Sequence, residues 1–191
     1  AISPMNIKND LVTPSFFLPD PWTKTNPSNS IWIKMLHKSI SALVKDNARS
    51  KINYTNYLYF LIFLLKFSNL KNFFIYLNLF YKSLKKKWYK SLFLDFFLHD
   101  CHINFLKNKK TDFSNIFFNS IAHIQHHYFF NSKPIKNKLK VNPEWYVKDE
   151  DDPLLDSLKV FDKIIGNYQS LDSKYDLMVA TGLRQIPYDL N

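Results

Sequence analysis

Glycine and cysteine are scarce in this chain of 191 residues, and each shortage excludes a class of site. The two glycines are Gly166 and Gly182. A P-loop or a dinucleotide-binding loop needs several glycines at fixed offsets, because its backbone turns tightly and approaches a phosphate closely. Cys101 is the only cysteine. An intramolecular disulfide and a cysteine-rich zinc site are therefore excluded.

Long apolar runs are also lacking. The most apolar run extends from Tyr57 to Leu65 and ends at Lys66, whereas a membrane-spanning helix needs about 20 residues. We expect no transmembrane segment and interpret the run as a buried helix, with an interfacial amphipathic helix as the alternative. The start of the chain shows no signal peptide, so the default location is cytoplasmic. A first residue other than Met, and an end soon after a predicted strand, suggest a fragment.

The composition is that of a folded and strongly basic chain. Hydrophobic residues make up 46%, aromatic residues 17%, and the net charge is +10. Such a charge suits nucleic acid, but Lys, Asn, Ile, Phe and Tyr are abundant together, as an AT-rich coding sequence produces. We therefore do not expect a nucleic-acid partner. Lysines such as those at 85–87 are interpreted as a solvated helix face, with a field that attracts a phosphate substrate as the alternative.

Apolar spacing predicts helices through the first half of the chain. Residues 1–29 hold five of the prolines and are expected to be irregular. Residues 30–108 read as a helical insertion or cap, with helices over 30–48, 56–67, 70–90 and 91–106. The third helix carries an apolar stripe that we assign to the core. The stripe consists of Phe73, Phe74, Leu77, Phe80, Tyr81 and Leu84.

Residues 109–191 read as part of an α/β core. Phe113 to Phe118 and Leu177 to Ala180 are short apolar runs that predict buried strands. Between them, one helix ends before Pro134, and a second begins at Pro153 with Asp152 as its cap. Strands that alternate with helices predict a parallel α/β sheet.

Three histidines follow the first predicted strand. His123 and His127 are one helical turn apart, so their imidazoles can project together and bind one metal ion. The carboxyl end of a strand is where open α/β sheets keep their ligands. Asn119, in the turn before the helix, is a candidate third ligand. His126 points partly away and is assigned to packing or to support of the ligands.

Two further polar groups have a simpler interpretation. The acidic run 149–152 is expected to be a solvated loop, because Ca²⁺ loops space their ligands at alternate positions and use a glycine turn. Asp95, His99, Asp100 and His102 form a second cluster. Since His99 lies four residues after Asp95, we expect a pair on a helix surface, with a catalytic dyad as the alternative.

The segments FFNSIAHIQHHYFF, DLMVATGLRQIP and PDPWTKT resemble proteins of the alkaline phosphatase superfamily, of the type I phosphodiesterase/nucleotide pyrophosphatase kind. The resemblance implies a parallel-sheet sandwich core and a hydrolase for small phosphate or sulfate esters. It also implies divalent metal ions, usually Zn²⁺ with Mn²⁺ as the alternative, and a nucleophile that lies outside this chain.

The resemblance also assigns site residues. Asn119 stands where the family has a metal-binding Asp, with His123 and His127 as the remaining metal ligands. Thr181-Gly182 replaces the family's Asp-His, so the metal site is expected to be altered or degenerate. Supporting or substrate-binding residues are Gln125, His126, Thr181 and Gln185. The alternatives are a non-catalytic member of the superfamily and a basic helical module that binds nucleic acid or a membrane surface.

Overall fold

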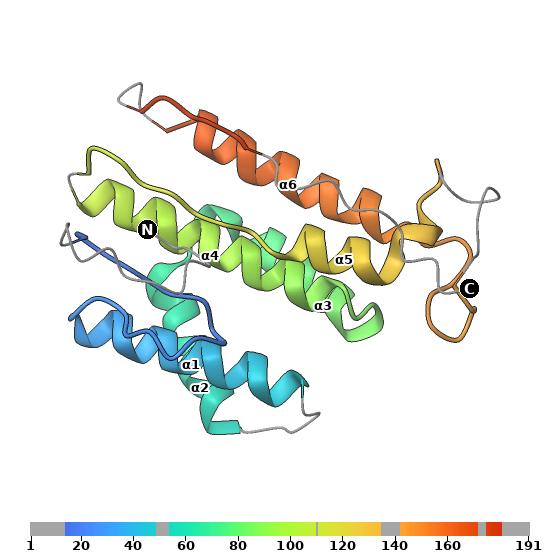
Figure 1. Cartoon of the computed structure of the whole chain (residues 1–191), viewed down its shortest axis with the longest axis horizontal. Coiled ribbons are helices and arrows are strands. Elements are labelled where there is room, and N and C mark those ends of the chain that lie inside the picture. Colours follow the sequence, from blue (N-terminus) through green and yellow to red (C-terminus); the bar gives the residue numbers. More distant parts are fainter. Residues whose placement is uncertain (1–13, 49–53, 110, 135–141, 172–174, 181–191) are drawn as a thin grey trace. The chain divides into compact units, whose positions relative to one another are not determined.

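A computed structural model describes residues 14–48, 54–109, 111–134, 142–171 and 175–180 (Figure 1). This part of the chain consists of helices joined by irregular segments, and its only extended pairing is at the isolated bridge residues Leu18 and Ile116. The helices are α1 Ile31–Ala48, α2 Tyr54–Phe67, η1 Leu70–Asn72, α3 Phe73–Lys85, α4 Tyr89–Asn108, α5 Ser120–Tyr128, η2 Phe129–Asn131 and α6 Pro153–Gln169.

The predicted α/β sheet is absent, so the expectation of a sandwich core of the alkaline phosphatase type is wrong. Neither 113–118 nor 177–180 forms a strand in the described chain. Their apolar side chains are not buried in a sheet, since Phe113 is 84% exposed and Met178 is 89% exposed. A short apolar run indicates a strand only when neighbouring strands satisfy its backbone.

The predicted helices are confirmed, except that the third helix is preceded by a 3-10 turn over Leu70–Asn72 and ends at Lys85 instead of at residue 90. The start of α6 shows why the sequence signal was strong there. The Asp152 carboxylate accepts a hydrogen bond from the Leu155 backbone N–H at 3.0 Å, and Pro153 occupies the first turn. The cap satisfies a backbone donor that has no partner inside the helix, and proline has no N–H at the position where none is needed.

The chain divides into two compact units. Unit 1 comprises residues 1–74 and 97–117, and unit 2 comprises residues 75–96 and 118–191. In unit 1, α1 packs against α2. Its core is rich in aromatic rings: Phe16 stacks on Phe105 with ring centroids 4.6 Å apart, and Phe60 meets Phe97 edge-on at 5.0 Å. Such pairs add specificity to the burial of large apolar side chains.

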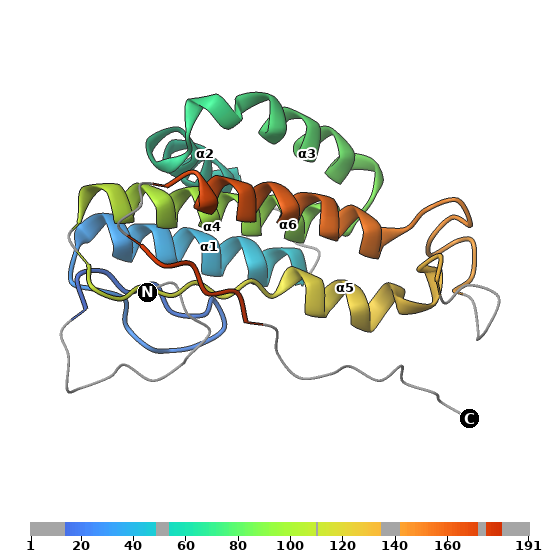
Figure 2. The same cartoon turned by 90° about the horizontal axis from the view of Figure 1, so that it is seen from above.

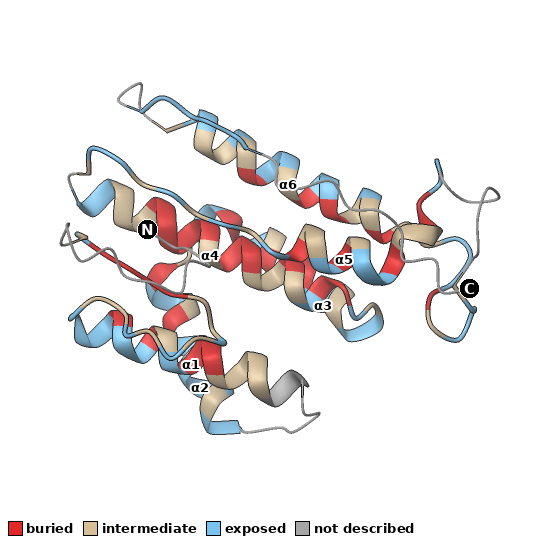
Figure 3. Ribbon diagram, viewed as in Figure 1, coloured by how far each residue is buried: buried red, intermediate tan, exposed pale blue. Residues whose placement is uncertain are grey.

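Unit 2 is built on the packing of α5 against α6, which lie side by side in both views (Figures 1 and 2). Ile124 of α5 and Ile164 of α6 are almost fully buried. The Trp88 ring packs on Tyr128 with centroids 5.3 Å apart. Buried residues are concentrated along α4, which contributes its first half to unit 2 and its second half to unit 1 (Figure 3).

Candidate functional site

Helix α2 has an apolar face that is exposed in the described chain. Its buried side chains are Phe63 and Phe67. On the opposite face, apolar residues recur at intervals of three and four positions, so they form one stripe along the helix. The members and their exposed fractions are Tyr54 80%, Tyr57 47%, Leu58 58%, Leu61 50%, Ile62 44% and Leu65 70%. The interpretation of residues 57–65 as a buried helix is therefore wrong for most of them.

Helix α3 repeats this arrangement. Tyr76 and Leu79 are buried. The aromatic stripe that the sequence assigned to the core is exposed instead: Phe73 52%, Phe74 79%, Leu77 49%, Phe80 55%, Tyr81 57% and Leu84 68%. The core assignment was wrong because the apolar spacing shows that a helix has an apolar face, but does not show what covers it.

Basic residues accompany both exposed stripes. No Asp or Glu lies between Asp46 and Asp95, whereas nine Lys and Arg residues do. We call residues 47–94 the acid-free segment. Four of its lysines lie over aromatic rings: Lys66, Lys82, Lys85 and Lys86. The Lys66 ammonium lies 3.8 Å from the centre of the Trp32 ring, and Lys85 Nζ also donates to the Tyr81 hydroxyl at 2.7 Å. The segment therefore combines apolar faces with a single sign of charge.

The histidine helix is α5, and it brings two of the predicted ligands together. The His123 and His127 rings have centroids 4.6 Å apart. Asn119 precedes the helix by one residue, and its carbonyl accepts the His123 backbone N–H at 3.0 Å. The Asn119 side chain makes no capping hydrogen bond. These three residues therefore follow one another at successive turns of one face.

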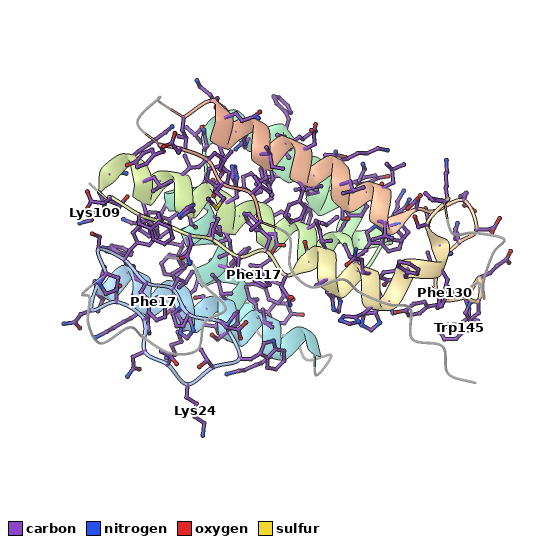
Figure 4. The ribbon with its side chains drawn as sticks, turned by 45° about the horizontal axis from the view of Figure 1, so that its top comes forward. Phe17, Lys24, Lys109, Phe117, Phe130 and Trp145 are labelled. Carbon is purple, nitrogen blue, oxygen red and sulfur yellow. The ribbon has the colours of Figure 1, made fainter. Side chains whose placement is uncertain are left out.

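Tyr146, on the loop before α6, completes this cluster. Its hydroxyl lies 3.1 Å from His127 Nδ1, and its ring stacks on Tyr128 at 5.2 Å. Figure 4 labels the neighbouring Trp145 beside this helix. If Nδ1 carries the proton and donates to the hydroxyl, the lone pair of Nε2 is available to a metal ion. Sequence reasoning missed Tyr146 because it is remote from α5 along the chain.

The surroundings of His123 favour its neutral form. Partial burial and the neighbouring His127 and His126 lower the pKa of His123. Burial and the hydrogen bond to Tyr146 raise the pKa of Tyr128. Since only a neutral ring offers a lone pair, the lowered pKa suits metal binding.

The other predicted site residues do not join this cluster in the described chain. His126 is exposed and Gln125 is half-buried on α5. Thr181 and Gln185 lie outside the described residues. Among the residues that are described, no group of three or more His, Cys, Asp or Glu side chains could hold a metal ion. A metal on His123 and His127 would therefore complete its shell with water or with other donors.

The polar cluster on α4 is buried rather than on a helix surface, which corrects the expected surface pair. Asp95, His99, Asp100 and His102 are each at most 6% exposed. Asp100 accepts the Asn69 backbone N–H and the Asn72 side-chain amide, both at 2.8 Å. The apolar residues of α4 are spread around the helix instead of lying on one face, and this pattern was the available signal that its polar residues would be buried.

Asp95 holds the start of the histidine helix. Its carboxylate accepts the backbone N–H of Ser120, the first residue of α5, at 3.0 Å. Burial raises the pKa of Asp95 to about 6, against the opposing effect of the Ser120 hydrogen bonds. The folded chain therefore favours the protonated carboxyl more than the unfolded chain does.

We expect Asp95→Asn to flatten the dependence of stability on pH. Because the folded-state pKa is raised, the stabilisation from protonation is fully present below the unfolded value of 3.8 and is lost as pH rises through about 6. The loss is of the order of 3 kcal/mol. Asn retains an acceptor for Ser120 but does not titrate. Urea unfolding from pH 4 to pH 7 measures the free energy of unfolding at each pH. The exposed Asp162→Asn variant is the control and should follow the wild-type profile. Parallel profiles of wild type and Asp95→Asn would refute the prediction.

The acidic loop has structural contacts. Asp151 forms an ion pair with Lys86, and Asp152 caps α6 while its second oxygen accepts the Lys133 backbone N–H at 3.1 Å. These contacts leave consecutive carboxylates with different partners, as expected for residues that point in different directions.

Comparisons with known proteins find no match: no family model, no curated protein and no solved structure is similar to this chain. Together with the absence of a sheet in the described residues, this finding overturns the resemblance to the alkaline phosphatase superfamily. The classification as a zinc hydrolase with that fold is withdrawn with it. Hydrolysis of a phosphate or sulfate ester stays an untested prediction.

No single described helix is long and apolar enough to cross a bilayer, whereas one bent pair, Tyr54–Phe67 with Leu70–Lys85, meets the requirements of length and composition.

Proposed function

We propose that this chain attaches to the surface of a membrane that contains anionic lipids, through the exposed apolar stripes of α2 and α3. The observation that carries the proposal is the α2 stripe, a continuous row of Tyr, Leu and Ile that is exposed although the opposite face of the same helix is buried. A helix that is apolar all round is covered either by protein or by lipid. In the described chain this face stays between 44% and 80% exposed.

The free energies of apolar burial and of charge attraction both favour attachment at the membrane surface. Complete burial of a Leu or Ile side chain contributes about 1.5–3 kcal/mol, so the partial exposure of several such residues leaves a substantial driving force. A lysine or arginine close to an anionic leaflet contributes about 1 kcal/mol. The acid-free segment contains no carboxylate that would oppose this attraction. Tyr rings and Lys side chains also suit the boundary between acyl chains and headgroups.

The composition of the stripe favours lipid over nucleic acid. Proteins hold single-stranded nucleic acid by stacking bases on aromatic rings and by pairing cations with phosphates, and these interfaces are polar. Leu58, Leu61 and Leu65 occupy the exposed α2 face, where they offer neither stacking nor hydrogen bonds. The aliphatic side chains instead match the acyl region of a bilayer.

Vesicle flotation tests this proposal. The protein is mixed with vesicles of phosphatidylcholine alone or of phosphatidylcholine with phosphatidylserine, at low and high salt. We expect strong binding to the anionic vesicles that salt weakens but does not abolish, because screening removes only the electrostatic part. Absence of binding to both vesicles would overturn the proposal. Tighter binding to single-stranded RNA, with a steep salt dependence, would assign the surface to nucleic acid instead.

A second proposal concerns divalent metal binding by α5. It is supported by the 4.6 Å approach of the His123 and His127 rings and by the contact of His127 with Tyr146. Two imidazoles one turn apart on a helix form a chelating pair, and Zn²⁺ or Mn²⁺ accepts nitrogen ligands, Zn²⁺ more tightly. Asn119 is a candidate for an additional oxygen ligand.

Zn²⁺ titration calorimetry tests the pair. We expect His123→Ala and His127→Ala each to weaken Zn²⁺ binding by about tenfold or more, because either change removes half of the protein ligands. His126→Ala is the matched control, since this exposed histidine lies on the same helix but outside the pair. Zn²⁺ affinity that all three substitutions leave unchanged, or reduce equally, would contradict the assignment.

A further inference from the structure

Unit 2 has a groove whose lining includes neither the exposed stripe of α3 nor the histidine pair. It has a volume of about 260 Å³ and is formed by α3, the beginning of α4 and α6. Ile75, Leu79 and Val160 form its apolar lining. Polar side chains line the rest of the groove, among them Asn78, Lys82, Tyr89, Asp156, Lys159 and Lys163.

Three lysines converge on this groove from two helices. Lys82 comes from α3, and Lys159 and Lys163 lie one turn apart on α6. In the described chain none of the three forms an ion pair with a carboxylate, although Asp156 and Asp162 also line the groove. The lining therefore carries three positive charges and two negative ones.

The Asp156 carboxylate has another role. It accepts the indole N–H of Trp88 at 3.1 Å. Burial raises the pKa of the Tyr89 hydroxyl, and the charge of Asp156 and its hydrogen bond to that hydroxyl raise it further. Tyr89 is in turn beneath Lys82, whose ammonium lies 5.1 Å from the ring centre. Asp156 is thus held by Trp88 and Tyr89, and the lysine ammonium groups remain available to an anion.

We propose that this groove binds the phosphate monoester of a small water-soluble molecule. Lysines are point charges that bind phosphate from several directions, and charge-assisted hydrogen bonds to phosphate are strong. The Asn78 amide offers a further donor at the rim. The volume suits a small solute, because drug-sized ligands occupy pockets of roughly 300–1,000 Å³.

The position of the groove on α3 indicates a solute rather than a lipid headgroup. At about 3.6 residues per turn, Ile75, Leu79 and Lys82 fall on the face opposite Leu77, Tyr81 and Leu84. If the exposed stripe of α3 rests on a membrane, the groove faces away from the lipid. The choice of a soluble ligand therefore rests on the proposed membrane function, whereas phosphate binding itself does not.

Titration calorimetry with inorganic phosphate and with glycerol 3-phosphate tests the groove. The variant is Lys82→Gln/Lys159→Gln/Lys163→Gln. The control, Lys107→Gln/Lys109→Gln/Lys148→Gln, changes the net charge equally through exposed lysines outside the groove; Figure 4 labels Lys109. We expect the groove variant to bind both ligands about tenfold or more weakly, since it loses the charge-assisted contacts, and the control to bind as wild type does.

Vesicle flotation of the same proteins separates the two proposals. The groove variant and the control are expected to bind phosphatidylserine vesicles, and vesicles that carry a lipid phosphate monoester, within about fivefold of each other. Lys82 belongs to the acid-free segment whereas Lys159 and Lys163 do not, and one lysine near an anionic leaflet contributes about 1 kcal/mol. The groove proposal would be overturned if wild-type protein bound neither phosphate nor glycerol 3-phosphate. It would also be overturned if both triple variants lost the same affinity for these ligands. Selective loss of binding to the phosphate-monoester vesicles would assign the ligand to a lipid. Wild-type protein that binds phosphate but no vesicle would refute the membrane function alone.

Discussion

Leu61→Gln/Leu65→Gln is expected to weaken binding to anionic vesicles by roughly 30- to 100-fold. The two side chains are 50% and 70% exposed on the α2 stripe, so they have a large apolar area to transfer into lipid. The lost transfer amounts to roughly 2–3 kcal/mol for the pair, because each Leu contributes about 1.5–3 kcal/mol when fully buried. Flotation with phosphatidylserine vesicles over a range of lipid concentrations measures the change.

The control for this double variant is Leu155→Gln/Leu158→Gln on α6. These leucines are 39% and 58% exposed and lie outside the acid-free segment. We expect vesicle binding like that of wild type from the control, and unchanged thermal unfolding from both double variants, since no core side chain is removed. Equal binding losses in the two double variants would show that general surface hydrophobicity, rather than the α2 stripe, drives attachment.

Phe96→Ala is expected to lower the free energy of unfolding by about 3–5 kcal/mol, which is the typical cost of truncating a fully buried aromatic side chain. Phe96 is 0% exposed on α4, and its ring meets Tyr76 of α3 edge-on with centroids 5.4 Å apart. The substitution leaves a cavity in a rigid core that cannot close around it. Urea unfolding followed by circular dichroism measures the loss.

Phe80→Ala on α3 is the matched comparison. Phe80 belongs to the exposed stripe and is 55% exposed, so its truncation should change stability by no more than about 0.5 kcal/mol. A loss for Phe80→Ala as large as that for Phe96→Ala would mean that the stripe is buried in the folded protein. The sequence pattern alone predicted this burial, so the pair of variants decides between the pattern and the structure.

The helices of this protein could be predicted from its sequence because their signals are local. The start of α6 depends on Asp152 and Pro153, which act within one turn. The adjacency of His123 and His127 likewise follows from helical geometry once α5 is assigned. Local spacing carries information of this kind without knowledge of the rest of the fold.

The exposure of the stripes could not be predicted, because burial depends on what packs against each helix. Tyr76 and Phe80 are both aromatic residues of α3, yet the first is 6% exposed and the second 55%. The sheet failed for a related reason. Residues 113–118 are apolar enough for a strand, but strand pairing requires partners remote in sequence, and the described chain supplies only an isolated bridge at Ile116.

Contacts between distant residues were also beyond sequence reasoning. Asp95 and Ser120 meet although 25 positions separate them, and Tyr146 reaches His127 across 19 positions. No periodicity encodes such pairs. They determine where α5 begins and which nitrogen of His127 remains available, so they decide the chemistry of the histidine pair.

The most direct test of membrane attachment is to place an environment-sensitive nitrobenzoxadiazole label at Leu61→Cys and record its emission with anionic vesicles. Selective labelling is feasible because Cys101 is fully buried and its thiol pKa is raised by that burial. Bound protein should give blue-shifted emission that brominated acyl chains quench, whereas the same label at Leu158→Cys should not change. Solvent-like, unquenched emission from position 61 in vesicle-bound protein would contradict insertion of the α2 stripe.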